Sequence, residues 1–429
     1  MKKIILPAKD DWEILCKRPA LIKSELEEVV RNIINDVRSR GDQALIDYSR
    51  KFDKVETGSI KVSTEELTDS STRVSVELKA AIDIARRNIE KFHSAQLKPE
   101  PKIETSPGVN CWRKNVAIEK VGLYIPGGNA PLFSTVLMLG IPSKLAGCKE
   151  IVICTPPDSK GNVSSPILYT ASLLGITSIF KTGGAQAIAA MAYGTETIPK
   201  VYKIYGPGNQ YVTKAKEMVQ QDGISIDMPA GPSEVLIIAD EKANPDFVAA
   251  DLLSQAEHGS DSHVILLTDS KDLMGQVERM IKKQLNETSR KEIASKALDN
   301  SMFVLLGSLN DCINFSNQYA PEHLIINTSN YSFLSDNIKN AGSVFLGKYS
   351  CESAGDYASG TNHTLPTNGN ARSFSGISTE SFTKNISFQE ISGTGIGNIG
   401  PSIELMAEAE NLYAHKNAVT VRLKYLKNV

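Results

Sequence analysis

Two short peptides contain residues whose types and spacing could do chemistry: Gln255-Ala256-Glu257-His258 and Pro321-Glu322-His323. The first places two side chains that can bind a metal three residues apart, and the second places a carboxylate beside an imidazole. Four of the six histidines lie in polar, glycine-containing or acidic stretches of the second half of the chain: His258, His323, His363 and His415. A zinc site with an adjacent acid–base pair requires such groups, so the chain reads as an enzyme.

The first peptide is expected at the end of a helix. Asn244-Pro245 has the residue types of an N-cap and a first helical position, and Gly259 is typical of a helix end. Gln255 and His258 would then share one face of the last turn. The alternative is a capped helix end whose histidine interacts only with the helix dipole, and glutamine is an infrequent zinc ligand.

The second peptide follows a proline and leads into an apolar run. A carboxylate and an imidazole at the start of a strand can serve as a base and a proton shuttle, although an ordinary surface loop could carry the same pair. Asp356 and His363 lie in a segment rich in Ser, Gly and Asn, which is either a solvated loop or one that a ligand orders. His415 lies far along the tail, where alone it would count as a surface residue.

The elements that must position these residues begin with helices. Apolar residues recur at helical spacing over Ser24–Tyr48 and Val74–Phe92. After Val121, four short apolar runs each end in a glycine or proline loop: Gly122–Ile125, Glu150–Cys154, Ser178–Lys181 and Val201–Tyr205. Helical stretches are expected between them at Phe133–Leu145, Ile167–Leu174, Ala187–Tyr193 and Tyr211–Val219. This strand-loop-helix repeat predicts a doubly wound parallel sheet, whose ligands bind at the carboxyl ends of the strands.

The loops at those carboxyl ends include Pro126-Gly127-Gly128-Asn129, Gly183-Gly184-Ala185-Gln186 and Gly206-Pro207-Gly208-Asn209. None gives the GxGxxG dinucleotide fingerprint, and turn chemistry alone could explain each glycine. Glycine or proline loops on four successive strands nevertheless favour a ligand at this edge of the sheet.

A second alternation follows Ser233. Strands are expected at Val235–Ile238, Val264–Leu267, Met302–Leu306, Leu324–Ile326 and Val344–Leu346, with the longest helix over Leu273–Ala297. After Thr379 the sheet pattern stops, and the tail reads as a loop, a helix over Ser402–His415 and a short apolar segment. The predicted fold class is α/β, with two doubly wound Rossmann-like sheet lobes, a helical N-terminal lead-in and a C-terminal tail extension.

Composition narrows the possible partners. A chain of 429 residues with 41% hydrophobic and 22% charged residues is globular and long enough for more than one lobe. The net charge of -2 gives no reason to expect nucleic acid or an anionic membrane as a partner. The apolar run Ile4-Ile5-Leu6 is too short for a signal peptide, and six scattered cysteines favour reduced thiols, so we expect a cytoplasmic protein.

Five motifs together resemble the histidinol dehydrogenase family, and the resemblance covers almost the whole chain. They are Val37-Arg38-Ser39-Arg40-Gly41-Asp42, Gly122-Leu123-Tyr124-Ile125-Pro126-Gly127-Gly128, Leu253-Ser254-Gln255-Ala256-Glu257-His258-Gly259, Tyr319-Ala320-Pro321-Glu322-His323-Leu324 and Gly355-Asp356-Tyr357-Ala358-Ser359-Gly360. The resemblance implies oxidation of L-histidinol to L-histidine through an aldehyde, in two NAD-dependent steps that end histidine biosynthesis. It also implies a homodimer with one zinc ion per subunit.

The resemblance also implies roles for individual residues. Zinc ligands would be Gln255, His258, Asp356 and His415, which would also contact the substrate, and Ser233, His323, His363 and Glu410 would add substrate contacts. NAD contacts would be Tyr124, Gln186 and Asn209, and the catalytic residues would be Glu322 and His323. His323 would take the protons of the substrate and Glu322 would activate water for the second oxidation.

The implied domains are an N-terminal extension (1–21), a helical lead-in (22–121) joined to 233–378 as the zinc and substrate lobe, an NAD-binding lobe (122–232), and a tail (379–429) that reaches the partner's site. Two other classes stay open on residue types alone. A zinc hydrolase would use the same His, Asp and Glu residues but would not reduce NAD. A non-catalytic binding protein would be expected to lack Glu322 or His323, and both are present.

Overall fold

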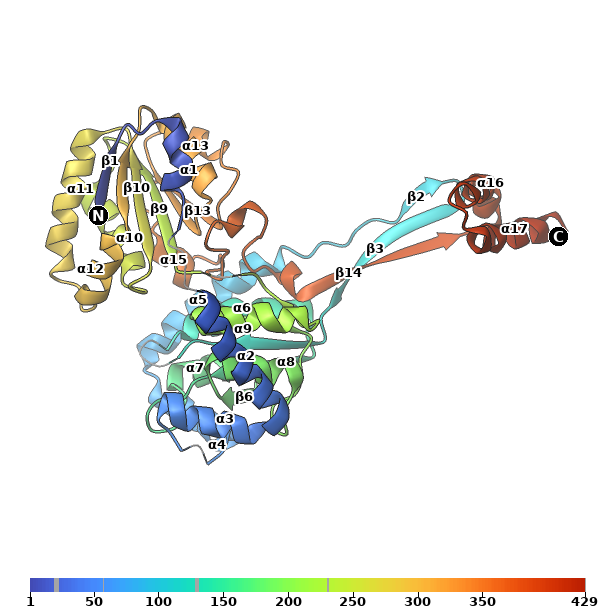
Figure 1. The fold of residues 1–429 in the computed structure, drawn as a ribbon, viewed down its shortest axis with the longest axis horizontal. Coiled ribbons are helices and arrows are strands. Elements are labelled where there is room, and N and C mark those ends of the chain that lie inside the picture. Colours follow the sequence, from blue (N-terminus) through green and yellow to red (C-terminus); the bar gives the residue numbers. More distant parts are fainter. Residues whose placement is uncertain (19–22, 57, 128–130, 230, 429) are drawn as a thin grey trace.

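The chain forms two α/β lobes and a long arm that ends in two helices (Figure 1). The computed structural model describes all residues except 19–22, 57, 128–130, 230 and 429. Each lobe contains a parallel sheet, and a three-stranded antiparallel sheet forms the arm. The predicted fold class of two doubly wound lobes with a helical N-terminal region is confirmed.

The first lobe is built on a five-stranded parallel sheet with the order β6-β5-β4-β7-β8. Its strands are β4 (Lys120–Tyr124), β5 (Glu150–Thr155), β6 (Ser178–Lys181), β7 (Lys203–Tyr205) and β8 (Ser225–Ile226). Its helices are α6 (Phe133–Ala146), α7 (Ser165–Leu173), α8 (Gly184–Tyr193) and α9 (Gln210–Gln221). Strand order reverses between β4 and β7, which makes the carboxyl ends of these two strands the place where a ligand would bind.

The N-terminal helices are α2 (Lys23–Arg40), α3 (Asp42–Tyr48), α4 (Thr64–Arg73) and α5 (Val76–Ser94), with a π-helical turn at Ser49–Asp53. Val30, Ile33 and Val37 on one face of α2 pack with buried residues of α8 and α9 in the first lobe. This differs from the expectation that the lead-in joins 233–378. Periodicity identifies an apolar helix face but not the sheet that covers it. Helix α5 packs against α6, and its Asn88 also donates to the Ala358 carbonyl of the second lobe.

The second lobe has a six-stranded parallel sheet with the order β1-β11-β10-β9-β12-β13. Its strands are β1 (Lys2–Ile5), β9 (Glu234–Ala239), β10 (His263–Thr268), β11 (Met302–Leu305), β12 (His323–Asn327) and β13 (Ser343–Leu346). Its helices are α1 (Trp12–Leu15), α10 (Pro245–Ala256), α11 (Lys271–Leu285), α12 (Lys291–Asp299), α13 (Leu309–Tyr319), α14 (Tyr331–Ser335) and α15 (Glu352–Tyr357), with 3-10 turns at Lys9–Asp11 and Asn370–Arg372. A further 3-10 turn at Thr379–Phe382 packs against α6 of the first lobe. The helix expected over Leu273–Ala297 is therefore two helices, α11 and α12.

The arm consists of β2 (Ile103–Ser106), β3 (Val109–Ala117), β14 (Thr383–Ile391), α16 (Gly393–Ala409) and α17 (Tyr413–Lys427). The expectation that the sheet pattern stops after Thr379 was wrong, because β14 pairs with β3 along its whole length. The single helix expected over Ser402–His415 was also wrong, since the chain turns between α16 and α17 within that range. Both strands are exposed or half-buried along most of their length, so they lack the one-sided apolar alternation that marks a packed strand.

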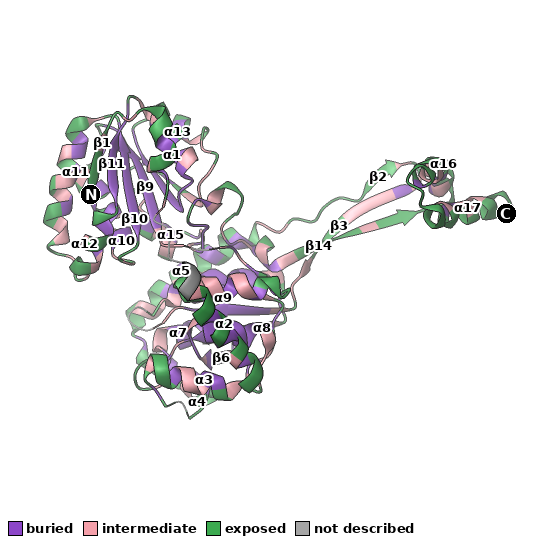
Figure 2. Cartoon of the chain, viewed as in Figure 1, coloured by how far each residue is buried: buried purple, intermediate pink, exposed green. Residues whose placement is uncertain are grey.

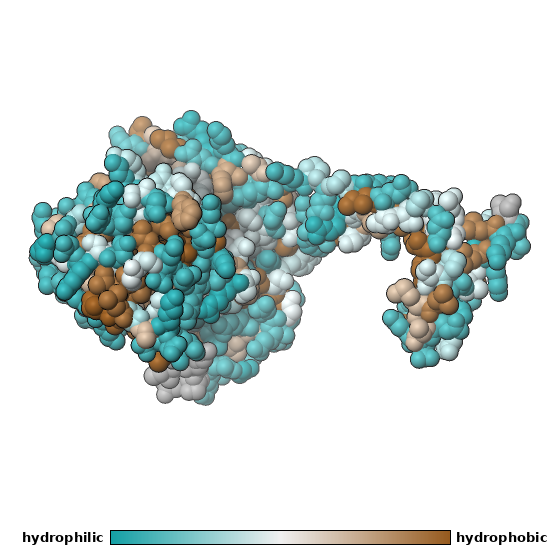
Figure 3. Space-filling view, turned by 90° about the horizontal axis from the view of Figure 1, so that it is seen from above, coloured by the Kyte–Doolittle hydropathy of each residue, from teal (hydrophilic) through white to brown (hydrophobic). Residues whose placement is uncertain are grey.

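Burial is concentrated in the two parallel sheets, whereas the arm is mainly exposed (Figure 2). Large apolar side chains on the two terminal helices remain open to solvent, among them Leu405, Met406, Tyr413 and Tyr425, and Figure 3 shows hydrophobic residues gathered at that end of the arm. All six cysteines are free, as expected. Within the described residues, no helix combines the length and the apolar character that crossing a bilayer requires.

Candidate active site between the two lobes

The adjacent carboxylate and imidazole lie at the amino end of the second sheet. His323 is the first residue of β12, as predicted, and pairs in register with Val235 of β9. The backbone N–H of Glu234 donates to Oε2 of Glu322 over 2.8 Å, and the Glu234 carbonyl lies 3.1 Å from Nδ1 of His323. Both side chains are buried. One residue of the neighbouring strand therefore fixes both members of the pair.

The geometry of His323 suits proton transfer. A ring nitrogen beside a carbonyl must carry a proton, so Nδ1 is the N–H and Nε2 is the atom that can exchange a proton with a substrate. Nε2 lies 3.5 Å from Oδ1 of Asp356, and neither of these buried atoms has a hydrogen-bond partner among the described residues. Buried polar atoms without partners are rare in folded proteins, so this pair marks the place where a ligand would bind.

Charges around His323 change its pKa. Burial lowers the pKa, but the negative charges of Glu322, Asp356 and Glu352 outweigh burial and hold the pKa well above its usual value. Burial raises the pKa of Asp356, and the nearby His323 ring more than offsets it, so that this carboxyl has a lowered pKa. A cation beside these carboxylates would weaken their effect and lower the pKa of His323, which would favour the neutral ring that can accept a proton.

A group of potential metal ligands lies next to His323. Ligand atoms of His258, Glu352 and Asp356 all lie within 4.8 Å of one another. The side-chain oxygen of Gln255 faces only acceptors, including the Glu352 carboxylate. Rotating the amide would resolve that conflict by letting Gln255 donate to Glu352, and a cation between the oxygens would resolve it as well. The donor set of imidazole and carboxylates fits a zinc ion.

Helix α10 has the predicted cap and first residue, but it ends before His258, which was expected in its last turn. The Asn244 side chain caps the helix by accepting from Asp246 N–H, and Pro245 is its first residue. The helix ends at Ala256, so buried Gln255 belongs to its last turn and exposed His258 lies in the turn that follows. The N–H of His258 donates to the Gln255 carbonyl over 3.3 Å, which keeps the two side chains in adjacent positions.

Glu352 is a site residue that the sequence reasoning missed. It lies four residues before Asp356 in α15, so the two carboxyls share one helix face. Burial raises the pKa of Glu352 well above its usual value, and nearby Asp356 and Glu322 act in the same direction. The i, i+4 spacing of the two acids in a segment already singled out for Asp356 was the available signal.

His363 connects this group to the first lobe. Its Nδ1 lies 3.1 Å from the Asp356 carbonyl and its Nε2 lies 3.2 Å from Oγ1 of Thr135, near the start of α6. The neighbouring Asn362 donates to the Met138 carbonyl in the same helix. Because α6 begins at the carboxyl edge of the first sheet, the edge expected to bind a ligand faces the histidine and carboxylate group.

The residues implied as NAD contacts lie at that carboxyl edge. Tyr124 ends β4, and its hydroxyl accepts from Gly184 N–H at the start of α8. Gln186 is buried in the first turn of α8, and Asn209 caps α9 by accepting from the N–H groups of its first turn. Gly206 has a φ of +126°, and a side chain there would collide with the Tyr124 carbonyl. The loop residues Gly128 and Asn129 lie outside the described residues.

Two of the predicted substrate contacts are far from this group in the same chain. Ser233 directly precedes Glu234, so it lies beside the Glu322–His323 pair. In contrast, Glu410 follows α16 and His415 belongs to α17, and both side chains are exposed at the far end of the arm (Figure 1). The structure of one chain therefore brings together the residues from both lobes, but not those of the tail.

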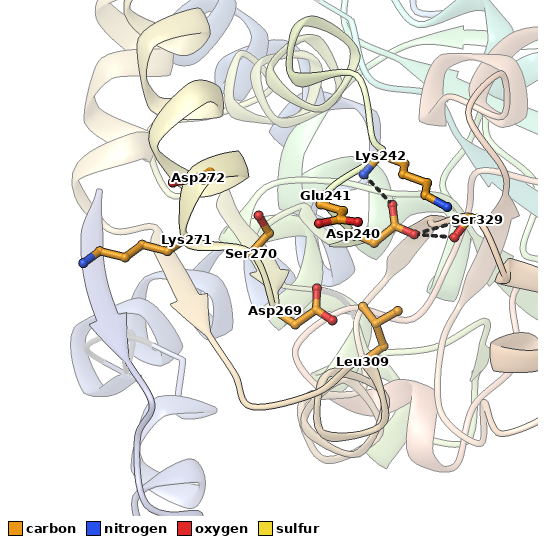
Figure 4. A pocket seen from close by; sticks show the side chains of 9 residues that line it. All are labelled: Asp240, Glu241, Lys242, Asp269, Ser270, Lys271, Asp272, Leu309 and Ser329. Atoms are coloured by element: carbon orange, nitrogen blue, oxygen red, sulfur yellow. Dashed lines mark hydrogen bonds between the residues drawn. The ribbon is translucent and has the colours of Figure 1, made fainter.

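A hollow of about 570 Å³ lies at the carboxyl ends of strands in the second sheet, opposite the end where Glu322 and His323 lie (Figure 4). Asp240 and Asp269 follow the carboxyl ends of β9 and β10 there, and Oδ2 of Asp240 accepts from both the N–H and the hydroxyl of Ser329. The Glu322–His323 pair lies at the amino end of β12, so this hollow is separate from the candidate site.

Comparison with known proteins agrees with the geometry. The family model described as histidinol dehydrogenase matches residues 16–423. The chain is 57% identical to the histidinol dehydrogenase of Bacteroides thetaiotaomicron over 100% of both chains, and 53% identical to that of Escherichia coli K12 over 96% of this chain and 95% of the relative. A crystal structure of histidinol dehydrogenase from Elizabethkingia anophelis has a TM-score of 0.97 at 57% identity and covers 100% of this chain and 99% of the other. The chain therefore belongs to the histidinol dehydrogenase family of NAD-dependent oxidoreductases.

Proposed function

We propose that this protein oxidises L-histidinol to L-histidine through L-histidinaldehyde, by two sequential hydride transfers to NAD, at the end of histidine biosynthesis. Family membership supports the substrate and the cofactor. The observation that carries the chemistry is the buried Glu322–His323 pair. Nε2 of His323 has no hydrogen-bond partner among the described residues and lies beside Asp356, near the boundary with the first lobe.

His323 is the base for the alcohol proton. With Nδ1 held at the Glu234 carbonyl, Nε2 accepts the proton of the substrate hydroxyl. A hydride leaves the carbon that bears this hydroxyl and passes to NAD, which gives the aldehyde. NAD is bound by the carboxyl edge of the first lobe, where Tyr124, Gln186 and Asn209 lie. Since that edge faces His363 and Asp356, hydride donor and acceptor can meet between the lobes.

Glu322 acts in the second oxidation. Its Oε2 is occupied by the Glu234 N–H, which leaves Oε1 to accept a proton from water. Water then adds to the aldehyde carbon to form the hydrate, and a second hydride transfer with loss of one proton gives the carboxylic acid. Keeping the aldehyde bound between the lobes prevents loss of a reactive intermediate.

Zinc would be held by Gln255, His258 and Asp356 of one subunit and by His415 from the arm of a second subunit, and when bound it supplies a Lewis acid that polarises the substrate oxygen. Glu352 orients Gln255 through its carboxylate. The exposed apolar residues of α16 and α17 support a homodimer in which each arm covers the other subunit.

The test is reduction of NAD by purified protein on addition of L-histidinol, followed by absorbance of the reduced nicotinamide. The proposal expects two NADH per histidinol consumed and histidine as the product. Consumption of substrate without any NADH would instead indicate a hydrolase that uses the same metal ligands.

A further inference from the structure

We propose that Arg18, in the segment that links the second lobe to the lead-in helices, is a positioning residue for the catalytic pair and acts through Glu234. The inference rests on the proposed function, because it assigns a role in the reaction of Glu322 and His323. Its basis is a set of contacts that connects the arginine to both sides of that pair.

The first contact is with Glu234. The Nε and Nη2 atoms of Arg18 each donate to one carboxylate oxygen of Glu234 over 2.8 Å, which is a bidentate ion pair. The Arg18 side chain is 12% exposed and that of Glu234 is 1% exposed. The backbone of the same glutamate bonds to Glu322 and to His323, so the ion pair immobilises the residue that orients both catalytic side chains.

The second contact is with the chain that enters Glu322. Nη1 of Arg18 donates to the Tyr319 carbonyl over 2.8 Å, and its guanidinium lies 3.6 Å from the centre of the Tyr319 ring. Ala320 follows with a φ of +55°, a conformation that non-glycine residues rarely adopt. Arg18 therefore stabilises the corner from which Pro321 and Glu322 begin, as well as the strand opposite.

Charge makes the arginine necessary for this arrangement. Burial raises the pKa of Glu234, and Arg18 opposes that change. Without the guanidinium, Glu234 would be a buried carboxylate with no cation beside it, which is costly to keep in place. It would take up a proton or move, and either change would disturb the backbone atoms that hold Glu322 and His323.

The kinetic test compares Arg18→Gln with Arg31→Gln, which breaks a surface ion pair with Glu27 and serves as the control. We expect Arg18→Gln to lower kcat by about 10–100-fold, as outer-shell residues do, with the KM for NAD unchanged because NAD binds the other lobe. Arg18→Lys keeps the charge but cannot form the bidentate contact with Glu234, so it should recover only part of kcat. Since both residues act as a unit, Arg18→Gln combined with Glu234→Gln should be no worse than Arg18→Gln alone, and multiplied losses would overturn the proposal.

A second readout does not depend on activity. The Nδ1 proton of His323 should be slow to exchange in ¹⁵N-histidine-labelled zinc-loaded protein, because it is buried against the Glu234 carbonyl. Its NMR signal is identified by its loss in His323→Asn. We expect Arg18→Gln to weaken or abolish the signal and Arg31→Gln to keep it. An unchanged signal in folded Arg18→Gln would overturn the proposal, even if the wild-type protein proved inactive on histidinol. If Arg18→Gln does not fold, Glu234→Gln and Arg18→Lys are measured in the same way, and normal signals in both would likewise refute it.

Discussion

Mixing two inactive variants, His258→Ala and His415→Ala, tests whether the arm completes the site of another subunit. His258 lies in the second lobe beside Glu352 and Asp356, whereas His415 lies on α17 at the end of the arm. If the arms cross between subunits, a heterodimer has one site with both defects and one site with none. If each site forms within one chain, every site keeps a defect.

The geometry of the arm favours the crossed arrangement. All nine residues of β14 pair with β3, and at about 3.3 Å per residue this ladder carries the chain about 30 Å away before α16 begins. For His415 to reach His258 of its own chain, much of that ladder would have to break. Each lost hydrogen bond would cost about 1 kcal/mol, so the folded arm should stay extended.

The expected recovery follows from random exchange of subunits. Half of the dimers become heterodimers and each regains one of two sites, so activity should reach about a quarter of wild type. A mixture of His258→Ala with His323→Asn is the matched control, because both changes lie in the lobes and every heterodimer site keeps one defect. Differently tagged subunits confirm exchange, and NADH formation from histidinol measures activity. Tagged heterodimers that form but show no activity would refute the crossed arrangement.

Three further predictions test the site and its lobe. Removing metal with a chelator should abolish NAD reduction and zinc should restore it, and full turnover by protein shown to be metal-free would contradict the assigned ligands. Glu322→Gln should slow oxidation of supplied histidinaldehyde more than the first oxidation of histidinol, whereas His323→Asn should slow both by roughly 10²–10⁴-fold; equal damage to the two steps by Glu322→Gln would disprove the division of roles. Burial raises the pKa of Asp251 from 3.8 to about 7, so the folded state holds its proton longer than the unfolded state and stability should fall as the pH rises between these values. The loss should be roughly 2–4 kcal/mol, and urea unfolding of Asp251→Asn, which cannot titrate there, should show a shallower pH dependence; parallel curves would exclude this role.

Sequence periodicity predicted the elements that pack locally. Strands β5 and β9 are apolar runs next to glycine or proline, and α10 has a cap, a first-turn proline and an apolar face. These signals come from a few neighbouring residues and survive without knowledge of the tertiary fold. Strands β1 and β8 were not predicted, because each is short and contains polar residues. Strands β3 and β14 gave no such signal because most of their residues are exposed or half-buried in a single chain.

The candidate site was predictable where residue type carries the chemistry. Glu322, His323 and His258 could be selected because carboxylates and imidazoles act through their side chains. Glu234 could not, because it contacts Glu322 and His323 through its backbone N–H and carbonyl, which every residue type except proline offers. Arg18 could not be selected either, because Glu234 and Tyr319, which it contacts, are more than 200 positions away in the sequence.

Strand β1 has a consequence for how the chain folds. Lys2 pairs with Met302 in a parallel ladder, so β1 completes its sheet only after about 300 more residues have been synthesised. The strands of the first lobe end at Ile226, so its sheet can form earlier. Contacts of such long sequence separation slow folding, and until β1 arrives, β11 presents an open sheet edge that can pair with other chains. Deleting β1 should therefore reduce the yield of folded protein before it affects the chemistry.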